Sequence, residues 1–83
     1  MTLAQQRIYR INQIRATIEA AMQSGLIVSE EKLIAESCLQ FGSSRRTVLE
    51  YLNALEHGGI IVRKDKKIWS TEAFNVDKLL KRK

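Results

Sequence analysis

The sequence contains no proline, one cysteine and one histidine, and each scarcity excludes a class of protein. Cys38 cannot form an internal disulfide, and Cys38 and His57 together supply too few ligands for a zinc cluster. No apolar run approaches the roughly 20 residues that a membrane span requires. The opening segment MTLAQQRIYR also lacks the apolar core of a secretory signal. We therefore expect a cytoplasmic protein in which Cys38 is a small buried hydrophobic residue.

The side-chain sets that usually perform enzyme chemistry are also missing. The chain has no Ser/His/Asp or Cys/His set and no glycine-rich phosphate loop, and 83 residues leave little room for a substrate pocket. We predict that the chain is not an enzyme, and we expect no cofactor, metal or small-molecule ligand. A domain this small has a marginal core unless a partner adds burial.

The basic residues are clustered, so the formal net charge of +5 is distributed unevenly along the chain. Residues 1–15 hold three arginines and no acid, RKDKK (63–67) holds four bases, and KLLKRK (78–83) holds four more. The acids gather largely in residues 29–37. Separated basic patches attract polyanions, most often nucleic acid, although a solvated and merely soluble surface is the alternative.

Apolar residues at three- and four-residue steps predict three long helices. The first runs from Leu3 to Gln23 and ends before Gly25, and a short β-type run follows at 26–28. The second begins after Ser29 and stops at Gly42; its inward residues are Leu33, Ile34, Ser37, Cys38 and Phe41. The third begins after a capping Ser43 or Ser44 and ends near His57; its inward residues are Val48, Leu52 and Leu55, with Tyr51 beside them.

The remaining segment predicts a hairpin and a short helix. IIVRKDKKIWS (60–70) has two apolar runs around a charged turn, which lacks Asn-Gly or Asp-Gly and so leaves the turn type open. TEAFNVDKLLKRK (71–83) predicts an amphipathic helix capped by Thr71 or Asn75. We interpret Trp69 as a lid on the core rather than a platform for stacking bases.

The run SEEKLIAESCLQFGSSRRTVLEYLNALEHGGIIVRKDKKIW resembles the winged helix-turn-helix superfamily of transcription regulators. The resemblance implies a mainly α fold with a small β-hairpin wing, in the order α-β-α-α-β-β-α. We predict a single domain (1–83) that comprises a long N-terminal helix (1–25), a helix-turn-helix (30–57), a wing hairpin (60–70) and a C-terminal helix and tail (71–83). In DNA-binding members the third helix lies in the major groove and the wing touches the backbone. The two-residue turn Ser43-Ser44 and the acidic Glu50 depart from the family pattern.

The third helix and the hairpin supply the predicted contacts to double-stranded DNA. Arg45 and Arg46 stand in a first helical turn, where a phosphate can collect guanidinium and backbone N–H bonds together. The full predicted set is Ser43, Ser44, Arg45, Arg46, Thr47, Glu50, Asn53, Arg63, Lys64, Lys66 and Lys67. Solvated arginines, an Arg46–Glu50 pair, capping hydroxyls and a charged hairpin tip that blocks edge pairing are the structural alternatives.

The two ends of the chain carry apolar residues that a lone domain would expose. We expect a homodimer through Leu3, Ala4, Ile8, Phe74, Val76, Leu79 and Leu80, unless both ends cover the chain's own core. The predicted function is sequence-selective duplex-DNA binding by a small transcriptional regulator, nucleoid-associated if prokaryotic or viral. A protein–protein adaptor in transcription or replication machinery and a non-specific architectural coat of DNA are the alternatives.

Overall fold

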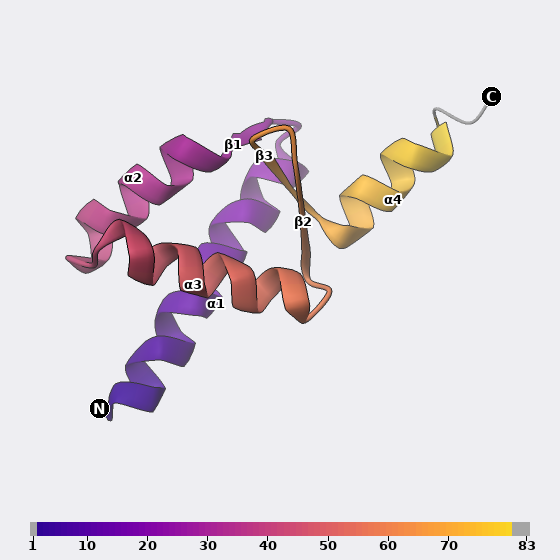
Figure 1. The fold of residues 1–83 in the computed structure, drawn as a ribbon. Coiled ribbons are helices and arrows are strands. Elements are labelled where there is room, and N and C mark those ends of the chain that lie inside the picture. Colours follow the sequence, from indigo (N-terminus) through magenta and orange to yellow (C-terminus); the bar gives the residue numbers. More distant parts are fainter. Residues whose placement is uncertain (1, 81–83) are drawn as a thin grey trace.

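The computed structural model describes the backbone of residues 2–80 and the side chains of residues 2–75. Its elements follow the predicted order and form a mainly helical fold with a small antiparallel sheet (Figure 1). The elements are α1 (Leu3–Gln23), β1 (Val28–Ser29), α2 (Glu30–Phe41), α3 (Arg45–His57), β2 (Ile61–Lys64), β3 (Lys67–Ser70) and α4 (Thr71–Leu80). The predicted bounds of α1 are confirmed.

The sheet has the strand order β1-β3-β2, so that β3 is its central strand. The hairpin pairs Arg63 with Ile68 and Lys64 with Lys67, which leaves Asp65 and Lys66 as a two-residue turn. Both turn residues have positive φ, 54° and 62° respectively, as a type I′ turn requires. The hairpin therefore adopts the turn type that matches the twist of its strands, although neither turn residue is a glycine, the residue that adopts positive φ without steric cost.

The core lies where α1, α2 and α3 meet the inner face of the sheet. Ten apolar residues are buried there: Ile14, Ile18, Leu33, Ile34, Val48, Tyr51, Leu52, Leu55, Ile61 and Ile68. The predicted inward residues of α3 are all buried, and those of α2 are buried or half-buried, with Cys38 and Phe41 at the margin. The apolar periodicity of the sequence therefore identified the faces of α2 and α3 that pack into the core.

Hydroxyl groups cap the starts of all four helices; the cap of α3 is as predicted and that of α4 is not. Ser44 caps α3 by accepting from the backbone N–H of Thr47 at 3.2 Å. At the start of α4 the cap is Ser70, which accepts from the N–H of Ala73 at 3.2 Å, so the predicted cap at Thr71 or Asn75 is wrong. Thr71 is used otherwise, because its hydroxyl donates to the carbonyl of Gly59.

The N-terminal turns of α1 and the body of α4 extend beyond the packed core. Their directions make the molecule 48 Å long against 21 and 20 Å across (Figure 1). Leu3 and Ile8 are exposed, with 84% and 59% of their surface accessible, whereas Phe74 packs against Trp69 with ring centroids 5.7 Å apart. The side chains of Val76, Leu79 and Leu80 lie outside the described residues. None of the described helices is long and apolar enough to cross a membrane.

Candidate nucleic-acid interface

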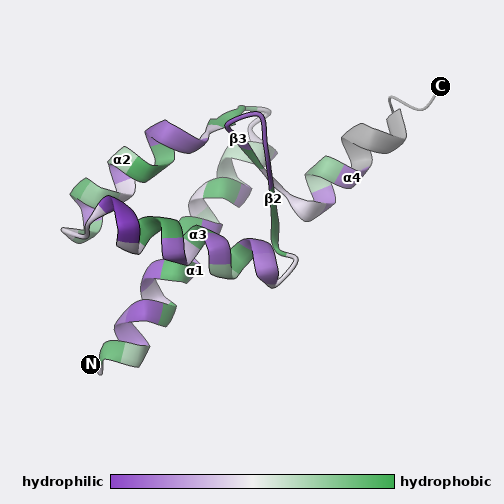
Figure 2. Cartoon of the chain, in the orientation of Figure 1, coloured by the Kyte–Doolittle hydropathy of each residue, from purple (hydrophilic) through white to green (hydrophobic). Residues whose placement is uncertain are grey.

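The first turn of α3 combines two arginines with a helix end that attracts anions. Backbone N–H groups at a helix start carry positive partial charge, and this turn contains no acidic residue to offset it. The cap Ser44 satisfies one N–H, and its hydroxyl also lies 3.0 Å from that of Thr47. Figure 2 shows hydrophilic colouring at this start of α3 and along the β2–β3 turn, as it does on parts of α1 and α2.

Arg45 is held by a carboxylate from the neighbouring helix. Its Nη1 and Nη2 donate to the two carboxylate oxygens of Glu31, in the first turn of α2, at 2.8 and 2.6 Å. These hydrogen bonds lower the pKa of Glu31 and raise the pKa of Arg45. Both side chains remain more than half exposed, so water and salt screen the pair.

Arg46 is the most accessible base of the turn, with 92% of its side chain exposed. Its Nε lies 3.9 Å from the carboxylate of Glu50, one helical turn later, which is the pairing that the sequence suggested as an alternative. Such a long, exposed contact holds the guanidinium weakly. Arg46 is consequently available to an external anion.

Arg63 bonds to other residues of the chain and is not one of the exposed bases of the hairpin tip. Its strand partner is the buried Ile68, which places Arg63 on the inner face of the sheet, and only 18% of its side chain is exposed. The guanidinium donates to Asn53 and, at 2.9 Å, to Glu56, and it lies 3.9 Å from Glu30.

The Arg63 contacts correct two predicted roles. The hydrogen bond from Arg63 lowers the pKa of Glu56. Because the Arg63 guanidinium is bonded to both Glu56 and Asn53, neither Arg63 nor Asn53 is free to contact an external ligand in this structure. Asn53 and Glu56 lie in α3 whereas Arg63 lies in β2, so the network joins two different elements and the periodicity of neither one could reveal it.

The hairpin tip presents three lysines. Lys64 and Lys67 lie directly opposite each other on neighbouring strands, and Lys66 is in the turn between them. All three are exposed. Like charges directly opposite destabilise a strand pair, and a bound anion would relieve that repulsion.

Arg10 of α1 is a further base at the α2–α3 turn, which the sequence prediction had left out. Its Nη1 donates to the hydroxyl of Ser43 at 3.2 Å, and its guanidinium lies 5.9 Å from the ring centre of Phe41. In the described part of the chain no carboxylate forms an ion pair with Arg10. Only the basic character of residues 1–15 could have pointed to it.

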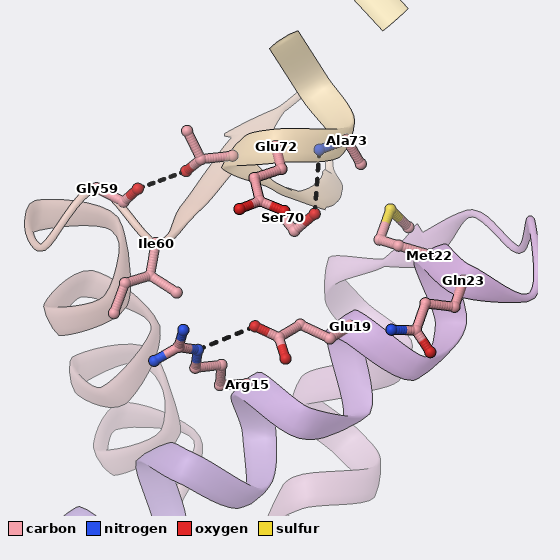
Figure 3. A pocket seen from close by; sticks show the side chains of 10 residues that line it. Arg15, Glu19, Met22, Gln23, Gly59, Ile60, Ser70, Glu72 and Ala73 are labelled. Carbon is pink, nitrogen blue, oxygen red and sulfur yellow. Dashed lines mark hydrogen bonds and ion pairs between the residues drawn. The ribbon is translucent and has the colours of Figure 1, made fainter. Parts of the chain in front are cut away.

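A separate open groove of about 750 Å³ lies between the second half of α1 and the start of α4 (Figure 3). The Arg15–Glu19 ion pair, at 3.0 Å, crosses one wall, and Ser70 and Glu72 stand on the other. Met22, Ile60 and Ala73 supply apolar surface. Across the described residues, no three His, Cys, Asp or Glu side chains are grouped closely enough to hold a metal ion.

The structure thus brings Ser43, Ser44, Arg45, Arg46, Thr47 and Glu50 together at the start of α3 and gathers Lys64, Lys66 and Lys67 at the hairpin tip. No protein-family model matches the chain, and no solved structure matches it significantly.

Proposed function

We propose that the chain is a winged helix-turn-helix protein that binds double-stranded DNA as a small transcriptional regulator. The observation that carries the proposal is the start of α3, where the highly exposed Arg46 stands in a first turn without acidic residues. A helix start with a free guanidinium suits a phosphate or the edge of a guanine.

The order of elements supports the winged-helix assignment. Helices α2 and α3 are separated only by residues 42–44, and the β2–β3 hairpin follows α3 directly. A short turn between two helices is the hallmark of a helix-turn-helix, in which the second helix enters the major groove. In this arrangement α3 is the recognition helix and the hairpin is the wing.

Eight of the predicted contact residues then receive a role. Arg46 reads a base edge or binds a phosphate, and the hydroxyls of Ser43, Ser44 and Thr47 position the backbone of the DNA. Lys64, Lys66 and Lys67 neutralise phosphates beside the groove. Glu50 pairs only weakly with Arg46 in the absence of DNA, and it accepts from a cytosine amine when a base faces it.

We further propose a homodimer, because two recognition helices one DNA turn apart would bind more tightly than one. The exposed Leu3, Ala4 and Ile8 supply the described part of the interface. Phe74, half-buried beside Trp69, contributes from the start of α4, whereas the predicted interface side chains of Val76, Leu79 and Leu80 lie outside the described residues.

Non-specific coating of DNA is the second candidate, and one observation favours it. Glu31 occupies Arg45, and Asn53 is bonded to Arg63, so few side chains on α3 are free to distinguish bases. A protein adaptor is the third candidate, supported by Leu39 on α2, of which 86% is exposed.

Fluorescence anisotropy with a random duplex and with a duplex selected from a random pool tests the proposal. Arg46→Gln should reduce the preference for the selected duplex by about tenfold, the lower part of the range for a lost base contact. Arg15→Gln is the matched control, since Arg15 is paired with Glu19 on α1, and it should keep the preference. Equal affinities of the wild type for both duplexes would favour coating, and no binding to either would favour the adaptor.

A further inference from the structure

Glu31 stands between the two basic elements of the proposed DNA interface. On one side it bonds to Arg45 at the start of α3. On the other side lies the hairpin turn, because the N–H of the adjacent Glu30 donates to the carbonyl of Lys66 at 3.0 Å. Glu31 therefore places a negative charge between the bases of α3 and the lysines of the hairpin turn.

The geometry of the Arg45–Glu31 ion pair determines which ligands Arg45 can bind while the pair is intact. Both terminal nitrogens of the guanidinium are directed at Glu31, in the two-pronged arrangement that Arg also uses to bind a phosphate or the O6 and N7 atoms of guanine. One fork cannot serve two acceptors in different places. DNA must therefore displace Glu31 before Arg45 can bind through its fork.

We infer that Glu31 is a positioning residue that withholds Arg45 from DNA and thereby weakens binding to arbitrary duplex sequences. The inference rests on the proposed DNA-binding function and deepens it. Only a ligand that holds the Arg45 fork better than Glu31 does, such as a well-placed guanine, recovers the contact in full. When only a phosphate is within reach, Arg45 exchanges the Glu31 carboxylate for another anion, and the binding free energy improves little.

The matched control is Glu36, another exposed glutamate of α2, because its change to glutamine removes the same charge. Glu31→Gln should tighten binding to a random duplex about two- to fivefold relative to Glu36→Gln, the range expected from one exposed ion pair. The released Arg45 should also make the slope of log affinity against log salt more negative by about 0.9, one additional phosphate contact. A purely structural role for Glu31 would not change that slope.

Replacing Arg45 in both backgrounds completes the test. Arg45→Gln should weaken random-duplex binding more strongly in the Glu31→Gln background than in the wild type, since only there is the fork free. Circular dichroism of every variant verifies folding.

Three results would count against the inference. Equal affinities and slopes for Glu31→Gln and Glu36→Gln would overturn it, and so would a gain that persists after Arg45→Gln. If neither the wild type nor any variant binds duplex DNA at low salt, the proposed function itself fails, and this inference fails with it.

Discussion

Replacing Lys66 by glycine separates the stability of the hairpin from its proposed function. Lys66 has φ of 62° in the β2–β3 turn, a left-handed conformation that costs an L-residue about 1–2 kcal/mol. Glycine removes that cost but loses about 0.5–1 kcal/mol to the greater freedom of the unfolded chain. The Lys66 side chain is exposed, so no packing is lost. Lys66→Gly should therefore stabilise the fold by about 0.5–1 kcal/mol.

Thermal denaturation followed by circular dichroism measures the effect. For a domain of this size the gain corresponds to a rise in Tm of about 2–8 °C. Asp65→Gly is the first control and should gain less, because aspartate tolerates the left-handed region better than lysine does. Lys64→Gly lies in strand β2 and should destabilise by about 0.5–1 kcal/mol.

The same change tests whether function accounts for a lysine at a position that suits glycine. If Lys66 binds a phosphate, Lys66→Gly should weaken duplex binding and flatten the salt slope by about 0.9 while it raises Tm. A Tm equal to or below that of the wild type would refute the argument from backbone strain. A higher Tm with unchanged DNA affinity would refute the phosphate contact alone.

Three further predictions concern the packing and ion pairs of the fold. Arg63→Met should lower the free energy of unfolding in urea by about 1–2 kcal/mol, because Glu56 loses a charged hydrogen bond, whereas the exposed Lys64→Met should stay within about 0.5 kcal/mol. The hydrogen bond from Arg63 lowers the pKa of Glu56, so the pair contributes its full stability above the carboxyl's ordinary pKa and loses it as pH falls through the lowered, folded-state pKa. The excess Tm of the wild type over Glu56→Gln should therefore shrink as the buffer is made acidic. Ile18→Val, at a fully buried site, should cost about 0.5–1.5 kcal/mol, whereas Ile8→Val, where 59% of the side chain is exposed, should cost under about 0.5 kcal/mol in the same urea titration.

Local patterns allowed most of the fold to be predicted from the sequence. The three long helices follow from apolar spacing, and Gly25, Gly42 and Gly59 mark their ends with positive φ. The cap of α4 was misplaced because serine and threonine are adjacent at Ser70-Thr71, and only the tertiary bond from Thr71 to Gly59 distinguishes their roles.

Long-range ion pairs explain why the candidate site was harder to predict. Glu31 and Arg45 are 14 positions apart, and their contact arises from the packing of α2 on α3. The Arg63 network similarly joins β2 to α3 and to the start of α2. Charge clustering identified the basic elements, but it could not show which bases the chain's own acids would hold. Arg46 and the tip lysines are exposed as predicted, because none of the acids whose side chains the structure describes binds them closely.

The dependence of random-duplex affinity on salt tests the central claim most directly. Each protomer has four such bases, Arg46, Lys64, Lys66 and Lys67. If each neutralises one phosphate at about −0.9, the slope of log affinity against log salt is roughly −3.6 per bound protomer. Changing the three lysines to glutamine should reduce the slope to about −0.9. A wild-type slope near zero, or one that the triple change leaves unaltered, would contradict the claim that α3 and the hairpin form a DNA-binding surface.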